Sequence, residues 1–259
     1  AGGRAAVKPV DWFEVGVTRI YEEREADDYN LQGVDFTAKL PGATTIKAEA
    51  ARSESSLPEA GILDNETGDA VSVSIETKPT PDLSITAYYK EADENFINPS
   101  ATSISRGMET WGSKGAYELD AETTLKAEYV SEDDKLNDSE HTLSAVGVER
   151  KFGEVTTELT LAHEESDDAY TAPGDPGSRE PYDISKVTPD SATTVRLGIT
   201  APLDEELSLS ASHRQNVEGD SSNLTGAGVE YRYDEATHLY LRGEYETLEE
   251  SEVTRVVSG

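Results

Sequence analysis

Four histidines are the side chains of this sequence best suited to proton transfer or metal binding, since the chain contains no cysteine. They are His141, His163, His213 and His238. Zinc ligands usually recur at short, fixed spacings, and no two of these histidines are so placed. A single histidine on a strand is most often a polar surface group. We therefore expect no metal site and no bound cofactor.

Nucleophilic catalysis is not indicated either. The sequence has no G-x-S-x-G turn of the kind that presents a catalytic serine. It also has no glycine-rich loop that would hold a phosphate at the start of a helix. Serine, aspartate and histidine are all present, but no spacing places them together. We predict that the protein is not an enzyme.

Three acidic segments offer the oxygen ligands that hard cations such as Ca²⁺ prefer. They are "LDNETGD" (63–69), "SEDDKLND" (131–138) and "ESDDAY" (165–170). None has the pattern of the twelve-residue EF-hand loop. A solvated, charged loop is the simpler interpretation, and calcium binding by these segments stays open.

Charge and hydropathy exclude several classes of protein. The chain has 53 Asp and Glu against 22 Lys and Arg, a net charge of −31 and a pI near 4.3. Such an acidic surface repels phosphates, so nucleic acid is not an expected partner. No stretch approaches the roughly 18 apolar residues of a transmembrane helix. Transmembrane strands stay possible, because they alternate and give only a weak hydropathy signal.

Apolar residues recur at every second position through most of the sequence, which is the pattern of β-strands with one apolar face. The runs predict an all-β protein of about fourteen strands, within a range of roughly 12 to 16. The predicted strands are 12–22, 32–40, 44–53, 69–78, 83–91, 108–119, 123–131, 141–151, 155–164, 192–201, 206–215, 224–233, 237–247 and 252–258.

Connections between these strands alternate in length. The short ones are 41–44, 79–82, 120–122, 152–154, 202–206 and 234–237. The longer, acidic ones are 22–30, 53–69, 91–106, 131–140, 164–191 and 216–223. In an up-and-down sheet this alternation puts short turns at one end and long loops at the other. Outer-membrane barrels have that arrangement, whereas Greek-key sandwiches have no reason to sort their loops.

The predicted strands separate aliphatic from charged side chains. The aliphatic face includes Val73, Ile85, Leu125, Leu197 and Leu241. Tyr and Trp near strand ends suit the aromatic girdles of a membrane boundary, although tyrosine is also common in any strand. The charged face would line an aqueous pore, and its candidate pore-lining residues are Glu76, Lys78, Lys90, Glu118, Lys126, Glu128, Arg196, Arg214, Glu230, Arg232, Arg242 and Glu244.

The hairpins "GAGVEYRYDEATHLYLRGEYE" (226–246) and "GAYELDAETTLKAEY" (115–129) resemble those of Gram-negative outer-membrane β-barrels, both porin-like and OmpA-like. The resemblance implies a membrane-spanning barrel that is delivered through the periplasm and passes small solutes if its lumen is open. It gives no catalytic residue. The sequence departs from the resemblance at "TRVVSG" (254–259), where such barrels commonly end in an aromatic residue.

We thus expect one up-and-down antiparallel transmembrane β-barrel over residues 1–259, in which 1–11 form an N-terminal extension. The expected function is a porin-like channel of the bacterial outer membrane, permeable to small solutes or ions and selective for cations because of its acidic loops. Its partners would be the lipid bilayer and its solutes, and a homo-oligomer or larger assembly is left open. The alternative is a non-catalytic all-β binding protein, either soluble at the cell surface or secreted, or a barrel that holds a partner.

Overall fold

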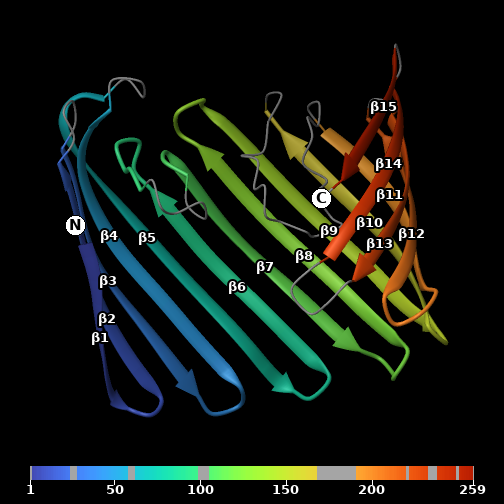
Figure 1. Ribbon diagram of the computed structural model, residues 1–259, viewed down its shortest axis with the longest axis horizontal. Coiled ribbons are helices and arrows are strands. Elements are labelled where there is room, and N and C mark those ends of the chain that lie inside the picture. The colour runs from blue at the N-terminus through green and yellow to red at the C-terminus, as the bar shows by residue number, and fades with distance from the viewer. Residues whose placement is uncertain are drawn as a thin grey trace. The chain divides into compact units, whose positions relative to one another are not determined.

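The computed structural model describes residues 2–23, 28–57, 62–98, 105–167, 191–219, 222–232, 238–248 and 251–258. These residues form one sheet in which every strand pairs with the next along the chain (Figure 1). The strands are β1 (Gly2–Val10), β2 (Phe13–Glu23), β3 (Asp28–Leu40), β4 (Thr44–Leu57), β5 (Ile62–Thr80), β6 (Leu83–Ala92), β7 (Met108–Glu118), β8 (Thr123–Asp134), β9 (Ser139–Phe152), β10 (Val155–Ser166), β11 (Ser191–Pro202), β12 (Leu207–Glu218), β13 (Ser222–Arg232), β14 (His238–Leu248) and β15 (Ser251–Ser258). No helix in the described ranges is long and apolar enough to span a bilayer.

Each strand predicted from the sequence coincides with one of β2 to β15, and the fifteen described strands fall within the predicted range. The N-terminal segment differs from the expectation. Residues 2–10, which we expected to lie in an extension, form β1, and Ala5 of this strand faces Val17 of β2. Two glycines and a proline in "GGRAAVKPV" weaken the strand pattern there, because neither residue type favours a strand interior.

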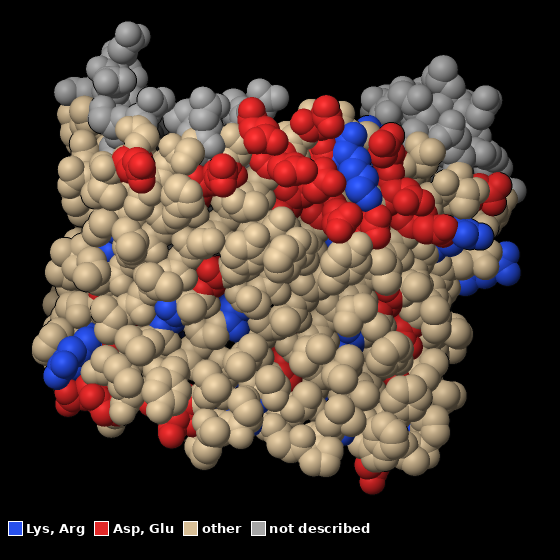
Figure 2. All heavy atoms as spheres, turned by 180° about the vertical axis from the view of Figure 1, so that it is seen from behind, with Lys and Arg blue, Asp and Glu red and all other residues tan. Residues whose placement is uncertain are grey.

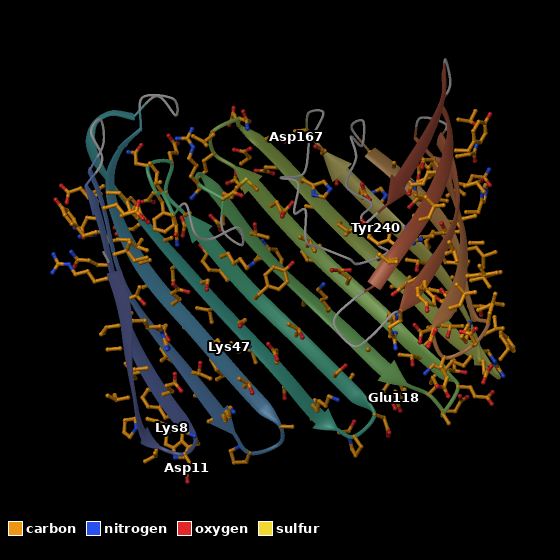
Figure 3. All side chains as sticks on the ribbon, in the orientation of Figure 1. Lys8, Asp11, Lys47, Glu118, Asp167 and Tyr240 are labelled. Carbon is orange, nitrogen blue, oxygen red and sulfur yellow. The ribbon has the colours of Figure 1, made fainter. Side chains whose placement is uncertain are left out.

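The chain divides into two compact units, which are described separately. The first contains Ala1–Gly115 and Val130–Thr142, and the second contains Ala116–Tyr129, Leu143–Ala169 and Val187–Gly259. Figure 1 shows β1 to β6 of the first unit as neighbouring strands. Figure 3 places Lys8 and Asp11 of the first unit by the turn between β1 and β2, and Lys47 further along β4.

The register of the first unit confirms the predicted separation of faces. Val34, Ala50 and Val71 lie opposite one another on β3, β4 and β5. Side chains from the next positions point to the other face, because successive side chains of a strand alternate. On the aliphatic face Val34 is 48% exposed and Ile85 is 37% exposed. Large apolar side chains that open to the outside are therefore a regular feature of this face.

The second unit repeats this pattern. Leu159 lies opposite Leu197, and Val229 lies opposite Leu241. Leu197 is 45% exposed and Leu241 is 51% exposed. A β-sandwich would cover such residues with a second sheet. Among the described residues of this unit no second layer buries them, so the aliphatic face is an outer surface.

Buried apolar side chains of the first unit gather on its charged face, where residues 93–98 fold back after β6. Phe96 and Ile97 of this segment pack with Tyr29, Leu31 and Ala70. The Tyr29 hydroxyl donates to the Ile97 carbonyl over 3.1 Å, and the Ile97 amide donates to the Ser53 hydroxyl over 2.9 Å. These contacts fix the segment against β3, β4 and β5.

Connections at the two ends of the strands differ, although less than predicted. The short turns include Gly42, whose φ of 80° suits glycine. At the other end, β4 continues to Leu57 and β5 begins at Ile62, so most of the predicted loop 53–69 is strand. Glu54 and Asp69 are exposed residues of these strands, and strands accept charges at exposed positions. The predicted turn 234–237 and most of the predicted loop 164–191 lie outside the described residues.

Candidate pore-lining face

A network of three charged side chains crosses β8, β9 and β10 on the charged face of the second unit. The Lys126 ammonium lies 2.8 Å from Glu149 and 3.3 Å from Glu158. The three side chains are 19–36% exposed. Because one cation faces two carboxylates, the network carries a net negative charge. Opposite charges on adjacent strands stabilise a sheet by roughly 0.2–1 kcal/mol per pair.

A row of arginines follows on β11, β12 and β14. Arg196 and Arg214 are direct partners in the sheet, and the positive charge of Arg242 also repels that of Arg196. Arg242 lies 3.0 Å from Glu244, and Glu158 and Glu244 oppose the positive charge near Arg196. Like charges held this closely on a wall favour an anion or water in front of them.

Two glycines of β13 make room for this row. Gly226 and Gly228 lie opposite Glu244 and Arg242. A Cβ atom on Gly226 would lie 3.1 Å from the Ser212 hydroxyl and 3.4 Å from a guanidinium nitrogen of Arg242. Because Gly226 and Gly228 have no side chains, Arg242 can extend across β13 to 3.5 Å from the Ser212 hydroxyl.

The charged face of the first unit is also built from ion pairs. The Arg4 guanidinium on β1 donates to Asp35 on β3 over 3.0 Å and lies 3.3 Å from Glu14 on β2. Gly16 lies between them, and a Cβ atom there would overlap the carboxylate and the guanidinium. Lys47 pairs with Glu76 across β4 and β5 at 3.1 Å.

Not all predicted residues are brought together. Lys90 lies beside Ser72 in the sheet and 5.8 Å from the ring of Tyr88. Glu230 lies opposite Ser208 and Tyr240, so Tyr240 also lies on the charged face. Lys78, Glu118 and Arg232 are exposed residues near the short turns, and Glu128 is a half-buried residue of β8. Figure 3 shows Glu118 and Asp167 of the second unit at opposite ends of its strands.

Several members of the face were missed in the sequence. They are Arg4, Glu14, Asp35, Lys47, Glu149 and Glu158. Alternation within each strand would have found all of them except Arg4. Each of the others lies an even number of positions from a residue of its strand that faces away from the aliphatic face. Arg4 lies in β1, which the sequence pattern did not indicate.

The described residues of this face form a charged wall of ion pairs. In the described ranges no group of three or more His, Asp and Glu side chains could hold a metal ion. His141 and Glu132 approach to 3.6 Å. His163 and His213 each lie 2.9 Å from a threonine hydroxyl.

Aromatic side chains flank the aliphatic face along β2. Phe13 and Tyr21 share that face and are eight residues apart. At about 3.4 Å per residue they are about 27 Å apart along the strand. A strand tilt of about 40° reduces this to about 21 Å along the membrane normal, close to the roughly 25 Å height of a barrel's apolar band. Figure 2 shows a broad surface with few charged side chains and a dense group of acidic side chains near its upper edge.

Two charged groups outside the strands have shifted pKa values. The backbone amide of Glu122 donates to the Asp120 carboxylate over 2.8 Å, and this hydrogen bond lowers the pKa of Asp120 below its ordinary 3.8. The Lys135 ammonium donates to Glu91 over 2.7 Å, and this bond raises the pKa of Lys135. Both groups therefore stay charged at neutral pH.

No protein-family model and no curated protein sequence matches this chain. Its structure is similar to OccK3 (OpdO) of Pseudomonas aeruginosa, with a TM-score of 0.61 and 9% identity over 98% of this chain and 79% of that chain. A BenF-like porin from Pseudomonas fluorescens Pf-5 gives 0.59 and 12% over 96% and 75%. A bacterial polysaccharide outer membrane secretin gives 0.55 and 8% over 98% and 85%. The predicted fold class is confirmed: this chain has the all-β, up-and-down antiparallel fold of outer-membrane porins.

Proposed function

We propose that the protein is a porin-like channel of the bacterial outer membrane, through which small solutes or ions diffuse passively. The observation that carries the proposal is the uncovered aliphatic face, on which Leu197 and Leu241 are about half exposed while ion pairs occupy the opposite face. Such a face is stable next to hydrocarbon and unfavourable in water. The likeness to a BenF-like porin supports the same function.

In this proposal residues 1–259 act as one barrel domain, and the predicted charged residues line its aqueous side. Water fills such a lining because charged groups are costly to dehydrate. The wall of the pore contributes selectivity through its rings of charge and no covalent chemistry. The protein is accordingly a channel and not an enzyme.

We infer that the channel prefers cations. The chain carries a net charge of −31. Two cations of the charged face, Arg4 and Lys126, each lie beside two carboxylates, so these positions keep a local negative excess. A negative lining concentrates cations and repels anions.

Anion preference is the competing function, and the row Arg196, Arg214 and Arg242 is the observation that favours it. If the permeation path is narrowest beside this row, an anion is stabilised there more than a cation. The two candidates predict reversal potentials of opposite sign.

The test is conductance of the detergent-purified chain in a planar bilayer under a tenfold KCl gradient. Stepwise currents whose reversal potential has the sign expected for K⁺ permeation support the proposal. A reversal potential of the sign expected for Cl⁻ permeation supports the anion-preferring channel instead. A monodisperse protein that stays soluble without detergent and gives no steps would overturn both.

A further inference from the structure

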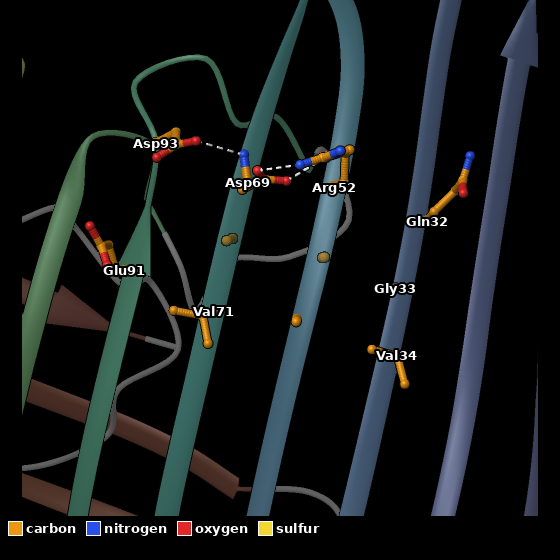
Figure 4. A pocket seen from close by; sticks show the side chains of 11 residues that line it. Gln32, Gly33, Val34, Arg52, Asp69, Val71, Glu91 and Asp93 are labelled. Atoms are coloured by element: carbon orange, nitrogen blue, oxygen red, sulfur yellow. Dashed lines mark hydrogen bonds and ion pairs between the residues drawn. The ribbon is translucent and has the colours of Figure 1, made fainter.

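An open groove lies on the aliphatic face of the first unit, where the apolar surface meets charged residues. Its volume is about 570 Å³, within the range of small-molecule sites. The floor is formed by β4, where Ala50 lies between Val34 of β3 and Val71 of β5 (Figure 4). Because alanine is much smaller than its two neighbours, the strand surface is hollowed there.

The groove continues along β4. Ala48, two positions from Ala50 on the same face, lies between Phe36 and Val73. At about 3.4 Å per residue, Ala48 and Ala50 form a stretch of roughly 7 Å in which small side chains lie between larger ones on β3 and β5. An extended hydrocarbon chain fits such a groove and buries apolar surface at about 25 cal/mol per Å².

Charged side chains close one end of the groove. Arg52 follows Ala50 on the same face and donates to Asp69 through two hydrogen bonds of 2.6 and 2.7 Å. Glu91 and Asp93 of the β6 end also line the groove, and the Asp69 amide donates to Asp93 (Figure 4). These four side chains carry one positive and three negative charges, and the Lys135 ammonium, 2.7 Å from Glu91, adds a second positive charge beside the rim.

This rim suits a headgroup that contains both signs of charge. A guanidinium keeps free N–H donors after binding one carboxylate, and phosphate is a preferred partner of arginine. An ammonium group gains mainly from Asp93, because Arg52 already binds Asp69 and Lys135 already binds Glu91. A headgroup with a phosphate alone would meet a net negative rim, so a purely anionic lipid is disfavoured.

We propose that this groove binds a phospholipid whose headgroup carries a phosphate and an ammonium group, with one acyl chain along Ala48 and Ala50. The inference rests on the proposed function, because that function places the aliphatic face in a bilayer. It adds a specific lipid-binding site to a surface that otherwise contacts the acyl chains of the bilayer without specificity. The phosphate lies by Arg52 and the ammonium by Asp93.

The test is lipid retention measured by native mass spectrometry of the detergent-purified chain, titrated with phosphatidylethanolamine or phosphatidylglycerol. We expect retention of phosphatidylethanolamine about tenfold above phosphatidylglycerol. Ala50→Leu fills the groove and should remove this difference. Ala127→Leu, which enlarges an alanine of the same face on β8, is the matched control and should keep it.

Equal retention of the two lipids, stronger retention of phosphatidylglycerol, or an unchanged Ala50→Leu variant would overturn the lipid site. Asp93→Asn tests the rim without changing the floor, and it should weaken phosphatidylethanolamine retention while circular dichroism stays unchanged. Conductance of the same samples separates the two claims. A conducting protein without lipid preference contradicts only this inference, whereas a selective but non-conducting protein contradicts only the channel.

Discussion

Replacing Ile75 by arginine places a charge at the middle of the aliphatic face. Ile75 lies between Ile46 of β4 and Ala87 of β6 and is 39% exposed. In a bilayer its environment is hydrocarbon, and an arginine near the midplane of a barrel costs about 2–4 kcal/mol. If the face met water instead, an exposed substitution would change stability by only about 0.5 kcal/mol in either direction.

The expected loss corresponds to a roughly 30- to 900-fold change in the folding equilibrium, since a tenfold change is about 1.36 kcal/mol. The assay is urea unfolding in phospholipid vesicles, followed by fluorescence of the two tryptophans and extrapolated linearly to water. Ser72→Arg is the matched control. Ser72 lies on the charged face of the same strand, between Glu49 and Lys90, and an arginine there stays wet.

We expect Ser72→Arg to remain within about 0.5 kcal/mol of the wild type. Reversed costs, with Ser72→Arg the more destabilising variant, would show that the faces are assigned the wrong way round. Equal small costs would show that water reaches both faces, and the membrane assignment would fail.

Three further predictions address the folded segment, the pore charge and the turns. Gly68→Ala should destabilise the protein by about 1–3 kcal/mol, because its Cβ would overlap the backbone of Phe96; Gly243→Ala, which meets no atom within 4 Å, is the control in the same unfolding assay. Lys126→Met leaves two carboxylates without their shared cation and should shift the reversal potential toward K⁺; a shift toward Cl⁻ would contradict the pore-lining assignment. Because the pKa of Asp120 is lower in the folded state, its contribution to stability is present above pH 3.8 and is lost as the pH falls through that lower folded-state pKa. Asp120→Asn should therefore make the urea midpoint less sensitive to acid. A pH profile equal to that of the wild type would contradict this prediction.

Strand existence and face assignment followed from the sequence because both depend on a period of two. Leu125, Leu197 and Leu241 lie where alternation predicted, on an exposed apolar surface. Contacts between strands depend on register, which a single sequence does not specify. The approach of Lys126 to Glu149 and Glu158 could therefore not be predicted, although all three residues lie in predicted strands.

Features without periodicity were the ones that the sequence could not indicate. Phe96 and Ile97 occur in a connection, where nothing in the pattern shows that the chain folds back onto β3. The segment is held by a buried serine and a tyrosine from distant strands. Likewise, Gly226 and Gly228 suggested a hairpin, and only the paired strands show that they make room for Arg242.

Spin-label accessibility along β11 tests the central claim most directly. The chain has no cysteine, so single cysteines at positions 194–200 each carry one label in a lipid vesicle. We predict a period of two, in which labels at Val195, Leu197 and Ile199 collide with oxygen dissolved in lipid. Labels at Arg196 and Gly198 should collide with a water-soluble nickel chelate. The opposite phase, or equal nickel access at all seven positions, would contradict an aliphatic face turned toward hydrocarbon.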